Sequence, residues 1–230
     1  MNQPDLQRLF AGLKAYLESS RRSGIRVFGP QQCMKSCAAN EQPHTAETLE
    51  AVREDMGECS RCGLCRHRTK IVFGQGNPRA RLVFVGQAPT MADDAAGQPF
   101  NGAEGDMLTN IITRVIKSSR CDVYLTNIVK CTPPDGRIPE HDEILACFSF
   151  LRRQLTAIGP SIVCALGQVA AQTLLGSGSS LEELRGRFYR AGDMLVMPTH
   201  DPAFLRVRED KKRETWTDMQ MIVRELSKTA

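Results

Sequence analysis

Residues 81–108 read RLVFVGQAPTMADDAAGQPFNGAEGDML, a strand pattern followed by two turns and the start of a helix. Residues 82–85 form a short apolar run of the kind that builds a buried strand. The run breaks at Gly86, and a second turn at Gly97 precedes apolar residues at helical spacing over 107–115. This order builds a pocket at the carboxyl edge of an open α/β sheet. It also suits a strand–loop–helix unit without a ligand, and the stretch alone leaves both interpretations open.

The rest of the chain repeats the alternation of strand and helix. Apolar strand patterns and amphipathic helix patterns follow one another, and a short hairpin and a final helix complete the series. The predicted strands are 123–129 and 162–166, the helices are 139–155, 168–175 and 210–226, and the hairpin is 188–190 with 194–197. Such alternation predicts a parallel sheet covered by helices on both faces.

Length and charge set the organisation that we expect. A chain of 230 residues with a net charge of +4 suits one large domain with an appendage, and a mild positive charge permits a polyanionic partner. We predict an N-terminal helical extension and linker over 1–56, with a helix over 2–20, and one domain over 57–230. No apolar run reaches the length of a membrane span, and the N-terminus lacks the apolar core of a signal peptide. We therefore expect a cytoplasmic protein that does not bind a membrane.

Nine cysteines in such a protein require an explanation other than a disulfide framework. Cys59 and Cys62 have the C-x2-C spacing that brings two thiolates to one metal centre, and Cys65 extends the run. Cys33 and Cys37 are interpreted as free thiols of the linker. Candidates for the remaining ligands are Cys121, Cys131, Cys147 and Cys164. Iron–sulfur, zinc and plain structural roles all remain open from the spacing.

Four main motifs follow one another along the chain: VGQAP at 85–89, GQPF at 97–100, YLTNIVKC at 124–131 and MPTHDPAFL at 197–205. In this order they resemble the motifs of the family 4 uracil-DNA glycosylases, the iron–sulfur branch of the uracil-DNA glycosylase superfamily. Supporting matches are RT at 68–69, VFGQGNP at 72–78 and LRGR at 184–187. The resemblance covers residues 57–228 and leaves the first 56 residues outside it.

This resemblance implies a three-layer α/β/α sandwich with a short parallel sheet, and a 4Fe-4S cluster of structural role. The implied ligands are Cys59, Cys62, Cys131 and Cys147, and Cys65 is a spare thiol. Zinc is the rival, because four thiolates also suit a tetrahedral zinc ion.

The resemblance also implies a DNA repair enzyme that hydrolyses the N-glycosidic bond of uracil, or of a related deaminated base, and leaves an abasic site. Phe100 would stack on the flipped base and Asn127 would read its edge, while the turn with Gly86 and Ala88 would lie near the sugar. Residues 198–205 would form a loop that presses into the duplex. We expect a monomer that contacts DNA through Pro202, Arg185 and Arg206, with Lys130, Arg187 and 211–213 as further phosphate contacts.

Three catalytic positions depart from the family pattern. Gln87 stands where the family usually has Glu, Thr90 where it has Gly, and Asp201 where it has the His that donates to the base oxygen. Negative charge grows on that oxygen as the bond breaks, and donors aimed at it are usually the largest catalytic term. At about 4 Å and an effective dielectric near 20, an ionised Asp201 would instead repel it by roughly 4 kcal/mol. That repulsion is worth on the order of a thousandfold in rate.

Three hypotheses reconcile these departures with activity. His200 could replace the missing donor if the loop is shifted, Asp201 could be protonated in an apolar pocket, or Gln87 and Asp201 could select a different lesion. The alternative function is a catalytically attenuated or inactive relative that binds DNA and damaged bases without turnover.

Overall fold

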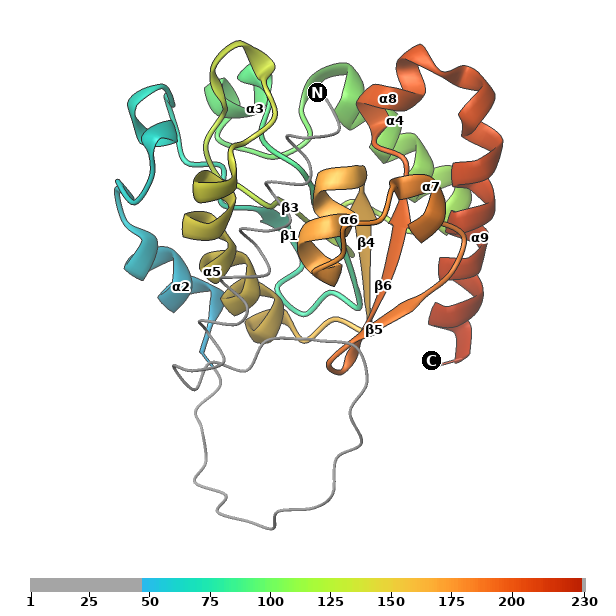
Figure 1. Ribbon diagram of the computed structural model, residues 1–230. Coiled ribbons are helices and arrows are strands. Elements are labelled where there is room, and N and C mark those ends of the chain that lie inside the picture. Colours follow the sequence, from blue (N-terminus) through green and yellow to red (C-terminus); the bar gives the residue numbers. More distant parts are fainter. Residues whose placement is uncertain (1–46, 229–230) are drawn as a thin grey trace, which may run out of the picture. The chain divides into compact units, whose positions relative to one another are not determined.

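The computed structural model describes residues 47–228, and Figure 1 shows their path. The described residues belong to one compact unit that begins at Glu47. The helix predicted over 2–20 and the thiols of Cys33 and Cys37 lie outside the described residues.

A six-stranded sheet forms the centre of the described unit, in the order β1-β3-β2-β4-β6-β5. The strands are β1 (Gln75–Gly76), β2 (Leu82–Gly86), β3 (Tyr124–Asn127), β4 (Ile162–Leu166), β5 (Tyr189–Ala191) and β6 (Met194–Thr199). The four inner strands are parallel, and β1 and β5 pair antiparallel at the two edges. The predicted parallel sheet and the hairpin near its end are confirmed.

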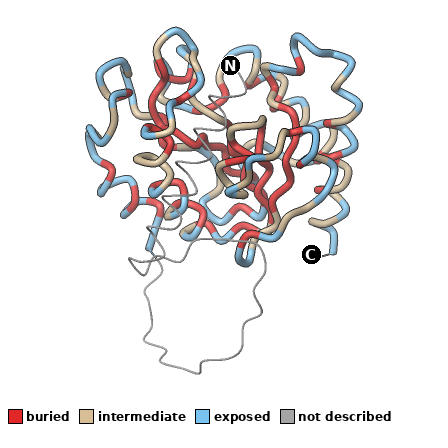
Figure 2. Tube along the Cα trace, viewed as in Figure 1, coloured by how far each residue is buried: buried red, intermediate tan, exposed pale blue. Residues whose placement is uncertain are grey.

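Helices cover both faces of the sheet, which gives the predicted three-layer α/β/α sandwich (Figure 1). On β2, Val83 and Val85 join one apolar core, while Leu82 and Phe84 join the other. The first core includes residues of α2 (Leu49–Met56), α5 (His141–Ile158), α6 (Gln168–Leu175) and α7 (Leu181–Leu184). The second includes residues of α4 (Gly102–Ile111), the π-helical turn η2 (Ile112–Ile116) and α9 (Lys212–Lys228). Strands buried on both faces explain their unbroken apolar sequences, and Figure 2 shows this burial concentrated in the sheet.

Helix α2 belongs to this unit, although the sequence assigned it to the N-terminal extension. It packs against α5 and buries Leu49, Val52 and Met56. Arg153 of α5 also binds Glu47, with 2.5 Å between Nη2 and Oε1. The compact unit therefore begins near residue 47 rather than at residue 57, because the buried face of α2 is part of its core.

The carboxyl ends of the parallel strands meet at one edge, and the segments that follow them gather there. β2 leads to α3 (Met91–Ala96), and β6 leads to α8 (Pro202–Val207) at the same end of the sheet (Figure 1). The loop predicted over 198–205 is wrong in its second half, because Pro202 opens a helix whose cap is Asp201. The other short helices are η1 (Gly63–Arg66), η3 (Pro134–Gly136) and η4 (Glu209–Lys211). No helix within residues 47–228 is long and apolar enough to cross a membrane.

Candidate functional site

Two strand ends and one loop meet at the carboxyl edge of the sheet. β2 ends at Gly86 and β3 ends at Asn127, and these two residues are cross-strand partners. A Cβ atom on Gly86 would lie 2.4 Å from Asn127 Oδ1 and 2.8 Å from Phe100 Cζ. Only glycine lets the amide and the aromatic ring approach β2 so closely. Three of the residues that the sequence singled out for base binding therefore form one cluster.

The Asn127 side chain is buried with unused hydrogen-bonding capacity. Its exposed fraction is 1%, and its Nδ2 has no hydrogen-bond partner among the described residues. An unsatisfied buried donor costs about 1–3 kcal/mol, so such a group commonly marks a ligand site or an unseen partner. Asn127 is fixed on the last residue of a central strand, and the adjacent Ile128 N donates to Gly86 O at 2.8 Å. The amide is thus held ready for an outside partner.

Phe100 lies in a loop with a strained backbone. Its φ is 56°, in the left-handed region that an aromatic residue rarely adopts, and its ring is buried. The buried Asp93 anchors this loop, because its Oδ1 accepts a hydrogen bond from Asn101 N at 2.6 Å. Asp93 also forms the capping box of α3 with Thr90. Thr90, one of the departures from the family pattern, therefore has a structural use as a helix cap.

A cleft of about 870 Å³ starts at the residue that follows Gly86. It lies between the turn after β2, the loop after β3 and the start of α8. Its lining includes Gln87, Ala88, Thr90, Glu104, His200, Asp201 and Phe204. The predicted catalytic residues Gln87, His200 and Asp201 thus share one cleft, and the Gly86 cluster adjoins it at Gln87.

Asp201 is the N-cap residue of α8. Its Oδ1 accepts a hydrogen bond from Ala203 N at 2.7 Å. Burial raises the pKa of the Asp201 carboxyl to about 6, and repulsion from Glu104 adds to the rise. Burial, together with the charge of Asp93, also raises the pKa of Glu104. Glu104 was not predicted from the sequence, and it is a second acidic residue beside Asp201 in the lining of the cleft.

His200 is engaged within the protein. Its Nε2 lies 3.0 Å from Glu214 Oε2, and its ring stacks on Phe204 with 5.1 Å between centroids. Its Nδ1 is buried and has no partner within the described part of the chain. Hydrogen bonds from Lys211 and His200 lower the pKa of Glu214 to about 2, which keeps the carboxylate ionised against the imidazole. One ring nitrogen of His200 is therefore held by Glu214, whereas the other is buried without a partner among the described residues.

The basic residues expected to contact phosphate divide into two groups. Arg185 is paired internally, with Nη2 3.0 Å from Asp218 Oδ2 and Nη1 3.1 Å from Glu214 Oε2. Lys130 is 1% exposed, so it does not reach a phosphate at the surface. These two predictions do not fit the structure, whereas Arg206 is exposed on α8 beside the cleft.

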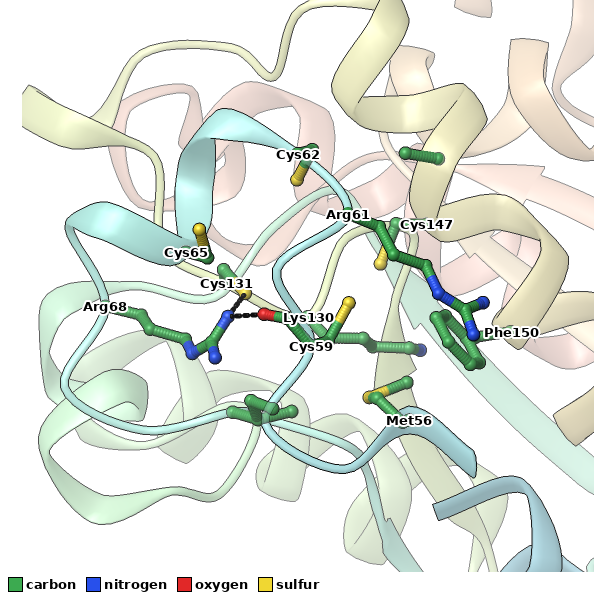
Figure 3. A pocket seen from close by; sticks show the side chains of 12 residues that line it. Met56, Cys59, Arg61, Cys62, Cys65, Arg68, Lys130, Cys131, Cys147 and Phe150 are labelled. Atoms are coloured by element: carbon green, nitrogen blue, oxygen red, sulfur yellow. Dashed lines mark hydrogen bonds between the residues drawn. The ribbon is translucent and has the colours of Figure 1, made fainter. Parts of the chain in front are cut away.

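A separate cavity gathers cysteines from three segments of the chain (Figure 3). The thiols come from the residues around η1, from the loop after β3 and from α5. They belong to Cys59, Cys62, Cys65, Cys131 and Cys147. Cys121 is exposed elsewhere, and Cys164 is buried in β4, so neither joins the group. The structure therefore brings the four predicted ligands together, with Cys65 among them.

Three basic side chains, those of Arg61, Arg68 and Lys130, line the same cavity. Arg68 Nη1 donates to Cys131 Sγ at 3.4 Å and to Cys59 O at 2.5 Å, as the dashed lines in Figure 3 show. Lys130 Nζ donates to Thr126 Oγ1 at 2.6 Å and to Asn127 O at 2.7 Å. One buried lysine thus contacts both the thiol cavity and the strand end that carries Asn127.

The thiols do not converge on one point. Over residues 47–228, no three His, Cys, Asp or Glu side chains are grouped as ligands of a single metal ion. A zinc ion needs its sulfur ligands about 2.3 Å away on all sides. Burial raises the pKa of Cys131, and it raises that of Cys147 to about 11, so metal binding would have to displace their protons.

Comparison with known proteins agrees with this geometry. The family model described as the uracil DNA glycosylase superfamily matches residues 73–220. The chain is 38% identical over 165 residues to a type-4 uracil-DNA glycosylase of Sulfurisphaera tokodaii, covering 68% of this chain and 75% of that protein. It is 35% identical over 184 residues to a type-4 uracil-DNA glycosylase of Archaeoglobus fulgidus, covering 76% and 92%. The chain therefore belongs to the uracil-DNA glycosylase superfamily.

Proposed function

We propose that the protein is a DNA glycosylase that hydrolyses the N-glycosidic bond of uracil in DNA and leaves an abasic site. The observation that carries this proposal is the meeting of Gly86, Phe100 and Asn127, with an unpartnered amide buried at the strand ends. Relatives that cover two thirds of the chain are named type-4 uracil-DNA glycosylases, which supports the same activity.

The three clustered residues have complementary tasks in holding a flipped base. The Phe100 ring provides a stacking surface, which is worth about 1–3 kcal/mol per base. The Asn127 amide offers one donor and one acceptor, as the O4 and N3–H of uracil require. Gly86 leaves room for both groups at the end of β2. Together they offset part of the cost of extruding the nucleotide, which is a few kcal/mol.

Asp201 determines how the leaving base is stabilised. Its carboxyl, with a pKa raised to about 6, donates a hydrogen bond only when it is protonated. Below about pH 6 it can meet the growing negative charge on the base oxygen, and above that pH it repels this charge. Gln87, which lines the same cleft, can hold a water molecule but is a poor base. We therefore expect an acid-favoured glycosylase of modest rate at neutral pH.

For the cofactor we propose a 4Fe-4S cluster held by Cys59, Cys62, Cys131 and Cys147. The four thiols that the family resemblance implies as ligands line one cavity, and four cysteine thiolates are the usual ligands of such a cluster. When bound, the cluster would serve as a structural cross-link between η1, the loop after β3 and α5. Arg68 and Lys130 would offset its negative charge.

The cofactor is tested by visible absorption and iron analysis of protein purified without oxygen. Cys131→Ser should lose the brown colour and the iron, while Cys65→Ser, its matched control in the same cavity, should keep both. A colourless wild type with stoichiometric zinc would contradict the proposal.

A second candidate function is an attenuated reader of damaged bases. Two observations favour it: Gln87 cannot act as a carboxylate base, and Asp201 ionises near neutral pH. This reader would keep uracil-dependent binding through Phe100 and Asn127 but would turn over slowly or not at all. A glycosylase for another lesion is the remaining alternative, because an ionised Asp201 accepts a hydrogen bond from an amino group or ring N–H.

The experiment is cleavage of a labelled oligonucleotide that contains one uracil, with enzyme in excess and alkali to reveal abasic sites. We expect cleavage that is faster at pH 5.5 than at pH 8, and its loss in Asn127→Ala. Uracil-dependent binding without cleavage at either pH would favour the attenuated reader. A panel of duplexes with other damaged bases is run on the same gel. Cleavage of one of these duplexes, but not of the uracil duplex, would favour a glycosylase for another lesion.

A further inference from the structure

Arg120 reaches from the turn before β3 to the loop that carries Phe100. Its Nη2 donates to Pro99 O at 3.1 Å, and its Nη1 lies 3.0 Å from Thr109 Oγ1. The same Nη1 lies 3.3 Å from Phe100 O and 3.4 Å from Gly105 O. One half-buried guanidinium therefore joins two successive carbonyls of the loop to helix α4.

The Arg120 guanidinium donates its hydrogen bonds mainly to these carbonyl oxygens and not to a carboxylate of the described residues. No carboxylate within residues 47–228 lies at ion-pair distance from it, since none of the ion pairs of this part involves Arg120. Burial lowers the pKa of Arg120, but an arginine remains protonated throughout the usual pH range. A desolvated cation that binds mainly backbone oxygens fixes a conformation, because charge-assisted hydrogen bonds are the strong ones.

The conformation that it fixes is costly. Phe100 has a φ of 56°, and α4 packs so tightly on its carbonyl that a Cβ on Gly105 would lie 1.7 Å from Phe100 O. Left-handed backbone at a bulky residue persists only where the surroundings hold it in place. Asp93 accepts a hydrogen bond from Asn101 N, the amide that follows Phe100, and Arg120 donates to the carbonyls of Pro99 and Phe100.

We propose that Arg120 is a positioning residue for base recognition, which holds the Phe100 backbone so that its ring meets the flipped base. This inference rests on the proposed function, in which Phe100 is the stacking residue. Arg120 itself need not touch the base or the DNA. A lysine in its place would keep the charge but not the planar fork that binds Pro99 O and Thr109 Oγ1 together.

The test is a double-mutant cycle between Arg120 and Phe100. Arg120→Lys, Phe100→Ala and the double variant are compared in single-turnover excision of uracil, and in affinity for uracil-containing and undamaged duplexes. Arg190→Ala serves as the matched control, because Arg190 is exposed on the edge strand β5. We expect Arg120→Lys to lower excision by about 5- to 150-fold, the range for loss of one base stack, with undamaged-DNA affinity unchanged. In the Phe100→Ala background the same change should cost almost nothing.

The outcomes separate the two proposals. Equal losses from Arg120→Lys with and without the Phe100 ring would overturn the positioning role and leave the glycosylase intact. An excision rate of Arg120→Lys equal to that of the wild type would also overturn the positioning role of Arg120. A wild type that neither cleaves nor preferentially binds uracil-containing DNA would overturn the proposed function and this inference with it. If excision is too slow to follow, uracil-dependent affinity supplies the same cycle.

Discussion

Asp201→Asn isolates the effect of one buried carboxylate. An asparagine caps a helix as well as an aspartate does, so the hydrogen bond from Ala203 N and the start of α8 should survive. The change removes the charge that burial and the neighbouring Glu104 disfavour. Any pH-dependent difference between the two proteins therefore reports the ionisation of Asp201.

The pKa of Asp201 sets the size and sign of that difference. Folding raises it from 3.8 to about 6. A carboxyl with a raised pKa stabilises the fold below its unfolded pKa, and that stability is lost as the pH rises through the folded pKa. A shift of about 2 units corresponds to about 3 kcal/mol at pH 8, but only about 1 kcal/mol at pH 4.5. The variant should therefore gain about 2 kcal/mol on wild type between these pH values, or roughly 4–8 °C in Tm.

Thermal and urea unfolding at pH 4.5 and pH 8 measure this gap, and single-turnover excision at the same pH values follows activity. Asp210→Asn is the matched control, because the exposed Asp210 carboxylate has its pKa lowered by Arg208 and should show no gain of this sign. Excision by wild type should fall as the pH rises through 6, and excision by Asp201→Asn should not. A stability gap of equal size at both pH values would refute the argument from burial.

Three further changes test the remaining structure. Gly86→Ala should lower uracil excision by about 5- to 150-fold, because the added Cβ crowds Asn127 and Phe100 at a cost of about 1–3 kcal/mol. Gly63→Ala is the control and should leave the rate unchanged, because the space around its Cβ is open. Equal excision rates in the two variants would contradict the close approach at Gly86. Arg185→Met should cost about 3–5 kcal/mol in urea unfolding, because it leaves the buried Asp218 unpaired, and should leave DNA affinity unchanged in a gel-shift titration. His200→Ala should keep the excision rate per folded molecule, and a large loss would restore His200 as the donor.

The layers of the fold could be predicted because burial leaves a direct mark on the sequence. The continuous apolar runs of β2 and β4 predict strands covered on both faces, and the structure has them there. Helix α8 was missed although its signal is present. Asp201 followed by Pro202 is a cap and first-turn pair, but the loop over 198–205 was expected from the family resemblance and this local signal was not used.

Contacts in the site that depend on strand order could be predicted, whereas contacts between distant segments could not. The meeting of Gly86 and Asn127 follows from topology, because neighbouring parallel strands end at one edge. The pairing of Arg185 with Asp218 depends on the register of a helix 33 residues further along the chain, which no local pattern gives. The role of Arg120 was also missed, because its partners include the backbone carbonyls of Pro99 and Phe100, and a sequence does not distinguish one carbonyl from another.

The span between Asn127 and Cys131 has a consequence for the living cell. Three residues separate them, and one of these, Lys130, binds back to Asn127 O. So short a tether cannot absorb a displacement at one end without passing it to the other. With the proposed cluster bound, iron starvation or oxidants that strip it would also loosen the grip on uracil. The mutation rate would then rise as the iron supply falls, through one short segment of this protein.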